Sequence, residues 1–112
     1  MDEIELEPEV ETWLRSLPRH EFGQATFHIE LLRERGPLLS EPYSRQLRGK
    51  LRELRFRVNR DQQRITYFIA PGGRIILLTV FRKTRWREQG EVARAERALQ
   101  RCLDEGHTAE DS

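Results

Sequence analysis

The chain of 112 residues is long enough for one hydrophobic core and too short for two. Its composition, 37% hydrophobic and 35% charged, is typical of a soluble protein, and no apolar run approaches the roughly 20 residues of a membrane-spanning helix. The acidic start, MDEIELEPEVE, lacks the apolar stretch of a secretory signal, and the single cysteine, Cys102, excludes an internal disulfide and fits a reducing cytoplasm. The Cys and His residues have no metal-ligand spacing, so we expect neither a metal nor another cofactor.

The first part of the chain is predicted to hold a short strand and two helices. Residues Ile4 to Leu6 are apolar at alternate positions, and Pro8 suits the first turn of a helix. Apolar residues then recur at helical spacing, which predicts a helix over Glu7 to Leu17. A second apolar stripe runs from Phe22 to Leu32 and ends at Gly36-Pro37. The two helices are close in sequence, so we expect a helical hairpin.

Three strands and a helix are predicted for the remainder. The strands are Lys50 to Val58, Gln63 to Ala70 and Arg74 to Phe81, and the short connections NRDQ and PGG predict antiparallel hairpins. The last strand is apolar on both faces, which predicts cover on both sides. A helix from Glu88 to Glu105 follows, and residues 107–112 are expected to form a flexible tail. These elements predict a single α+β domain over residues 1–106, with an N-terminal strand, a helical hairpin packed on an antiparallel three-stranded meander, and a C-terminal helix.

The net charge of +1 conceals a strongly basic central segment. Residues 45–87 contain 13 Lys or Arg and two Asp or Glu, whereas the flanks contain seven basic and 17 acidic residues. Basic segments of this kind bind phosphate-rich partners through counterion release. The alternative is a set of solvated strand faces. The regular spacing of the charges along successive predicted strands favours the phosphate-binding interpretation.

Apolar and basic residues alternate from Leu54 to Val58. We expect the apolar side chains to face the helical hairpin, and Arg55 and Arg57 to lie on the opposite face of the strand. Arg64, in the next strand, joins them if the register is right. With Arg82, these residues are predicted to form a cationic groove.

Three segments in this order, QLRGKLRELRF, QQRITYFI and IILLTVFRKT, resemble the RelE/ParE superfamily of bacterial toxins, most closely its HigB-like branch. With the helices ahead of them, the resemblance extends from about Ile4 to Leu103. It implies the toxin of a type II toxin–antitoxin system, a metal-independent endoribonuclease that cuts messenger RNA in the ribosomal A site. In such enzymes the 2′-hydroxyl of the RNA attacks the adjacent phosphate. The implied partners are the ribosome, its mRNA and a helix-turn-helix antitoxin in a hetero-oligomer, in the cytoplasm.

This reaction needs a base, an acid and a group that stabilises the extra negative charge of the phosphorane. Arginine suits the stabilising role because its guanidinium stays protonated. The resemblance places the stabilising arginine at Arg64 and a basic pair beside the scissile phosphate at Arg82 and Lys83. Lys50 and Lys83 are the candidates for proton transfer, and Glu53 either orders a neighbouring arginine by pairing or serves as a base.

Six further basic residues and one aromatic residue are predicted to bind RNA: Arg48, Arg52, Arg55, Arg57, Arg85, Trp86 and Arg87. Trp86 is suited to stacking on a base and equally to a core or interface position. The segment TRWREQGEV lacks the tyrosine or histidine that well-known members of the superfamily carry near the last helix, so the acid and the base stay open. His28 is expected to be structural, and Tyr67 to lie in the core with its hydroxyl at the rim.

Two other functions remain open on this fold. A ParE-like protein would poison DNA gyrase without catalysis, and the basic cluster on the sheet argues against that alternative. A passive basic module would bind RNA or an acidic protein without cleaving it.

Overall fold

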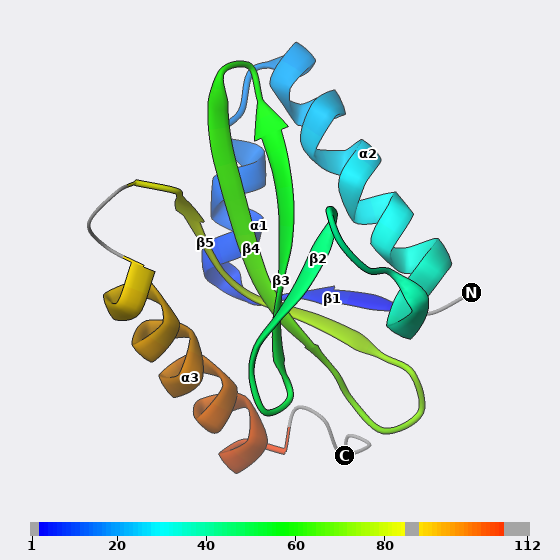
Figure 1. Cartoon of the computed structure of the whole chain (residues 1–112), viewed down its shortest axis with the longest axis vertical. Helices are drawn as coiled ribbons and strands as arrows, with labels where there is room; N and C mark the ends of the chain where they lie inside the picture. The colour runs from blue at the N-terminus through cyan, green and yellow to red at the C-terminus, as the bar shows by residue number, and fades with distance from the viewer. Residues whose placement is uncertain (1–2, 85–87, 107–112) are drawn as a thin grey trace.

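A computed structural model describes residues 3–84 and 88–106 of the chain. They form a five-stranded mixed sheet with helices on both faces (Figure 1). The strand order is β1-β5-β4-β3-β2, with β1 parallel to β5 and the other pairs antiparallel. The elements are β1 (Ile4–Leu6), α1 (Pro8–Arg15), α2 (Arg19–Arg35), the 3-10 turn η1 (Gly36–Leu38), β2 (Ser44–Arg48), β3 (Leu51–Val58), β4 (Asp61–Ile69), β5 (Ile75–Arg82) and α3 (Glu88–Asp104).

The α+β class agrees with the sequence prediction, but the meander has four antiparallel strands instead of three. The additional strand, β2, pairs with β3 across a tight turn at Gly49 and Lys50, in which Gly49 has a φ of 55°. Of the residues of β2 only Ser44 is buried, so the strand lacks the apolar alternation by which strands are recognised. Lys50, expected to begin a strand, lies in the turn.

The helices α1 and α2 cover the same face of the sheet, as expected, but they do not close into a compact hairpin. α2 packs over β3, whereas α1 packs over β5 (Figure 1). Between them and the sheet lies the main core, to which β3 contributes Leu54, Phe56 and Val58 as predicted. The spread of the two helices leaves a groove between them.

The opposite face of the sheet carries α3. Ile76 and Leu78 of β5 and Phe68 of β4 pack there against Ala95 and Cys102 of the helix. Because Ile75 and Leu77 belong to the other core, β5 is buried on both faces, as its sequence predicts. Within the described residues, no helix is both long and apolar enough to cross a membrane.

A bulge in the middle of β5 changes which side chains share a face. The pairing shifts between Thr66 and the next residue of β4, so that β5 carries one residue more than its partner. Beyond the bulge Phe81 lies opposite Arg64, and Arg82 lies opposite Gln63. Since neighbouring residues of a strand point to opposite faces, Arg82 and Arg64 lie on different faces of the sheet. The prediction that Arg82 and Arg64 line one cationic groove is therefore wrong.

Candidate anion-binding site

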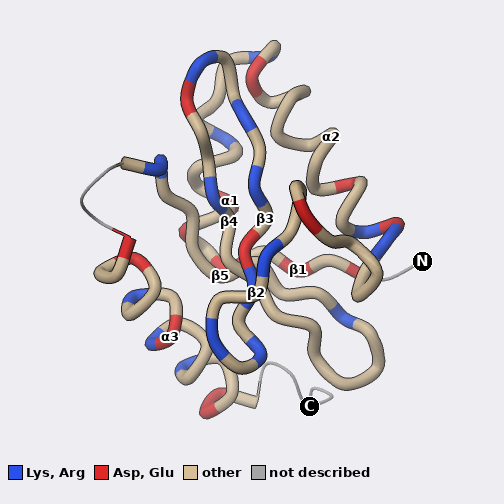
Figure 2. Tube along the Cα trace, viewed as in Figure 1, with Lys and Arg blue, Asp and Glu red and all other residues tan. Residues whose placement is uncertain are grey.

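Three arginines of β3 and β4 line one hollow of about 250 Å³ on the face of the sheet that carries α3. The register places Arg55 directly opposite Arg64, and Arg57 opposite Gln62. Like charges at directly opposed positions destabilise a sheet, so this surface favours an anion. Figure 2 shows basic residues gathered along β2 and β3 and at the tip of the β3–β4 hairpin. We call this cavity the arginine hollow, lined by Pro42, Arg55, Phe56, Arg57, Gln62 and Arg64.

Arg64 forms the floor of the arginine hollow. Its side chain is only 4% exposed, and its two terminal nitrogens donate hydrogen bonds to the carbonyl oxygen of Gln63 at 3.1 Å and to Oε1 of Gln62 at 3.2 Å. Burial lowers the pKa of Arg64, although arginine stays protonated in proteins. Arg55 is 26% exposed in its side chain and Arg57 is exposed, so these two form the walls through which an anion approaches.

Glu53 lies beneath these arginines and is inaccessible to solvent. Its Oε2 is 3.6 Å from Nε of Arg55 and 3.7 Å from Nε of Arg64. Burial raises the pKa of Glu53, and the positive charge of Arg64 opposes that rise. Of Arg55 and Arg57, which share its strand and its face of the sheet, Glu53 thus pairs with Arg55, while Arg57 donates to the carbonyl oxygen of Arg60 at 3.5 Å.

A second hollow, of about 460 Å³, adjoins the first through Gln62. Arg82 has a side chain 62% exposed and lies 3.8 Å from a carboxylate oxygen of Asp61. Nζ of Lys83 is 3.3 Å from Glu88 at the start of α3. We call this second cavity the Arg82 hollow, lined by Arg60, Asp61, Gln62, Arg82, Lys83 and Thr84.

Three other predicted basic residues, in β2, in β3 and in the turn between them, lie away from both hollows. Arg48 pairs with Glu96 of α3 at 3.1 Å. Lys50 is exposed in the β2–β3 turn. Arg52 points to the opposite face of the sheet from Arg55, where its Nε donates to the hydroxyl of Ser44 at 3.3 Å. The structure therefore does not bring these three residues together with the arginine hollow.

Several other predicted positions are placed as follows. Arg85, Trp86 and Arg87, and the tail at 107–112, lie outside the described residues. His28 stacks on Phe56, with ring centroids 5.1 Å apart, in agreement with a structural role. Tyr67 is wholly buried, and its hydroxyl lies 2.5 Å from that of Ser44 rather than at a rim.

Gln62 and Arg60 line these hollows and were not among the predicted site residues. The sequence predicts a four-residue turn that contains both, whereas β4 begins already at Asp61. The turn is shorter because Asn59 adopts a left-handed backbone, with a φ of 57°. An asparagine between two alternating segments is the signal that could have indicated this tight turn.

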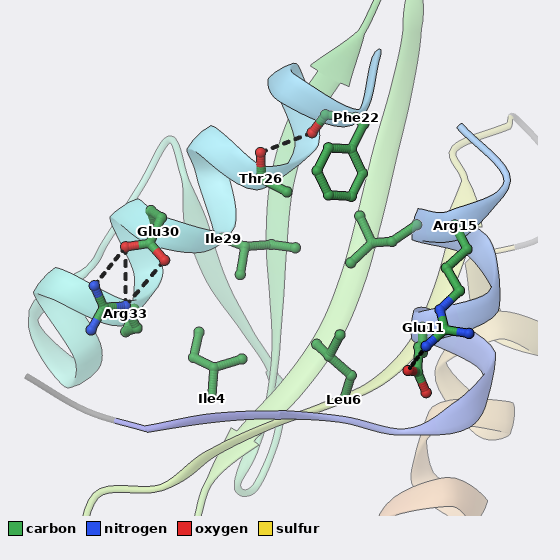
Figure 3. A pocket seen from close by; sticks show the side chains of 10 residues that line it. Ile4, Leu6, Glu11, Arg15, Phe22, Thr26, Ile29, Glu30 and Arg33 are labelled. Atoms are coloured by element: carbon green, nitrogen blue, oxygen red, sulfur yellow. Dashed lines mark hydrogen bonds and ion pairs between the residues drawn. The ribbon is translucent and has the colours of Figure 1, made fainter. Parts of the chain in front are cut away.

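A separate groove of about 550 Å³ lies between β1, α1 and α2 (Figure 3). Its lining is mainly apolar, with Ile4 and Leu6 on β1, Leu14 on α1 and Phe22 on α2. Its charged residues are paired with each other, Glu11 with Arg15 at 2.8 Å and Glu30 with Arg33 at 2.7 Å. An apolar groove with neutralised charges does not suit a polyanion, so the arginine hollow on the α3 face and the adjoining Arg82 hollow are the candidate site.

Comparison with known proteins places the chain in a recognised group. The family model described as "Phage derived protein Gp49-like (DUF891)" matches residues 12–102. Among solved structures, a chain of the archaeal RelE–RelB complex from Pyrococcus horikoshii OT3 is similar, with a TM-score of 0.55 and 20% sequence identity. The match covers 75% of this chain and 97% of that chain, and it shows a RelE-like fold. Among curated proteins no similar sequence was found.

Proposed function

We propose that this chain, which belongs to the Phage derived protein Gp49-like family and has a RelE-like fold, is the toxin of a type II toxin–antitoxin pair. In this proposal it is an endoribonuclease of HigB-like type that cuts mRNA in the ribosomal A site and so inhibits translation. The observation that carries the proposal is the arginine hollow, in which Arg55, Arg57 and Arg64 converge from adjacent strands.

The proposed chemistry needs no group beyond the RNA and the side chains of the two hollows. The 2′-hydroxyl gives up its proton and attacks the adjacent phosphorus, the bond from phosphorus to the 5′-oxygen breaks, and the departing oxygen takes up a proton, which leaves a 2′,3′-cyclic phosphate and a 5′-hydroxyl. Arg55 and Arg64 neutralise the charge that develops on the phosphorane. Arg57 and the Arg82 hollow hold the neighbouring backbone. Lys83 is the lysine available for proton transfer, because it lines the Arg82 hollow whereas Lys50 lies in the remote turn.

An antitoxin is the proposed protein partner. The similar archaeal structure is a RelE–RelB complex, which supports pairing of this chain with a protein of the antitoxin class. The helix-turn-helix type of that antitoxin, and the ribosome and mRNA as the other partners, rest on the HigB-like resemblance of the sequence.

Expression of the chain from a tightly repressed promoter tests the toxin function. We expect growth arrest with the native chain and none with Arg64→Lys, which keeps the charge but loses the two-pronged guanidinium that binds phosphate. Arg101→Lys, at an exposed position of α3, serves as the matched control and should still arrest growth. Arrest with double-strand DNA breaks and intact mRNA would favour the gyrase alternative, and the absence of arrest by the native chain would favour a passive module.

A further inference from the structure

Glu53 is a carboxylate that the proposed chemistry does not use, and its position is unusual. It is inaccessible to solvent, and neither of its oxygens accepts a hydrogen bond from a described residue. The Nε atoms of Arg55 and Arg64, which face it, are likewise buried without a hydrogen-bond partner among those residues. The contacts of 3.6 and 3.7 Å are thus ion pairs slightly longer than hydrogen bonds.

We infer that Glu53 is a positioning residue whose carboxylate holds the side chains of Arg55 and Arg64 together at the arginine hollow and does not itself contact the substrate. The register forces these two arginines to be direct neighbours on one face of the sheet. Without a negative charge between them, their repulsion would separate the two guanidinium groups. The inference rests on the proposed function only in taking the hollow as the RNA-binding site.

Burial distinguishes this role from that of a base. A general base must come within hydrogen-bond distance of the proton that it accepts, and a carboxylate with no exposed surface does not meet that condition. Arg64, by contrast, is held from two sides: Nε faces Glu53, while its terminal nitrogens face Gln62 and Gln63. The carboxylate therefore acts on the substrate through the arginine.

The charges around Glu53 make this arrangement sensitive to pH. Arg64, Arg55 and Arg45 favour its ionised form, whereas Glu88 of α3 opposes ionisation. Burial has the largest influence and raises the pKa of Glu53. As the pH falls, Glu53 takes up a proton before ordinary exposed carboxylates do, and the two arginines lose the charge that holds them.

Arginine Nε resonances of the full chain, followed by NMR as the pH is lowered, test the inference. We expect the Arg64 and Arg55 signals to move together in one titration, and to lose that titration in Glu53→Gln. Glu30→Gln, which removes the carboxylate of an exposed ion pair on the other face of the sheet, should leave it unchanged. Arg64 and Arg55 signals that do not respond to pH in the native chain would overturn the inference, whether or not the variant folds.

Ribosome-dependent RNA cleavage provides the second readout. If Glu53 positions the arginines, Glu53→Gln raises KM and lowers kcat by about tenfold or more each, and removes the acid limb of the pH profile. A profile whose acid limb persists in Glu53→Gln would contradict the inference. If the native chain does not cleave RNA, the proposed function fails, while the NMR titration still decides the role of Glu53.

Discussion

Glu53 and Arg64, on neighbouring strands, form an ion pair in which both side chains are almost completely removed from solvent. Burying two charges costs more free energy than their attraction commonly returns. Burial raises the pKa of the carboxyl and lowers that of the guanidinium, which agrees with that cost. The presence of this buried ion pair is therefore better explained by a role in anion binding at the arginine hollow than by a contribution to stability.

Replacing both partners separates stability from toxicity. We expect Arg64→Met alone to lower the free energy of unfolding by up to about 3 kcal/mol, because it leaves Glu53 buried with Arg55 as its remaining ion-pair partner. The double variant Glu53→Met, Arg64→Met should recover most of that loss in urea titrations and yet cause no growth arrest. A double variant that arrests growth would place the activity outside the arginine hollow.

The stability of the chain should depend on pH through Glu53. The pKa of Glu53 is higher in the folded state than in the unfolded state. The stabilisation that its protonation gives the folded chain is therefore fully present below the ordinary glutamate pKa and is lost as the pH rises through the folded-state pKa. Urea titrations from about pH 4 to pH 8 should therefore show the free energy of unfolding of the native chain falling, relative to that of Glu53→Gln, as the pH rises. A difference that is constant or moves the other way would contradict this.

Binding of single-stranded RNA should show the contributions of the two hollows separately. Arg57 and Arg82 are exposed, so their replacement by alanine should leave the fold intact. Each replacement is expected to weaken binding and to reduce the salt dependence of log K by about 0.7. Arg101→Ala is the matched control. Unchanged salt dependence in both variants would show that neither hollow contacts the RNA backbone.

The thiol of Cys102 should be unreactive in the folded protein. It is 1% exposed, and burial, together with the neighbouring Glu7 carboxylate, raises its pKa to about 11. At about pH 8 a thiol reagent should label it in urea, where the pKa returns to roughly 8.5, and only very slowly without denaturant. Rapid stoichiometric labelling of the native chain would show that α3 does not pack as described.

The sequence predicts the alternation of Leu54, Phe56 and Val58 with basic residues correctly, because a two-residue period determines which side chains face the core. It does not predict β2, whose side chains are mostly polar and exposed, since an edge strand is formed by backbone pairing to β3. The bulge in β5, which separates Arg82 from Arg64, likewise leaves no sign in the apolar run of that strand.

The candidate site was predictable in part. A hairpin that brings Arg64 beside the arginines of β3 could be anticipated, but the expected four-residue turn would set it opposite Arg57, whereas the two-residue turn sets it opposite Arg55. The burial of Glu53 could not, because it depends on what lies over its strand and not on the strand itself. Gln62 was expected in the turn and not at the site, because the turn between β3 and β4 is two residues shorter than predicted.

Cleavage of a defined mRNA on purified ribosomes tests the central claim most directly. With a known codon in the A site, the native chain is predicted to cut the mRNA within that codon, to require the ribosome, and to lose the cut in the Glu53→Met, Arg64→Met double variant. An mRNA left intact by the native chain, or one cut equally by the double variant, would contradict the assignment of the arginine hollow as a ribonuclease site.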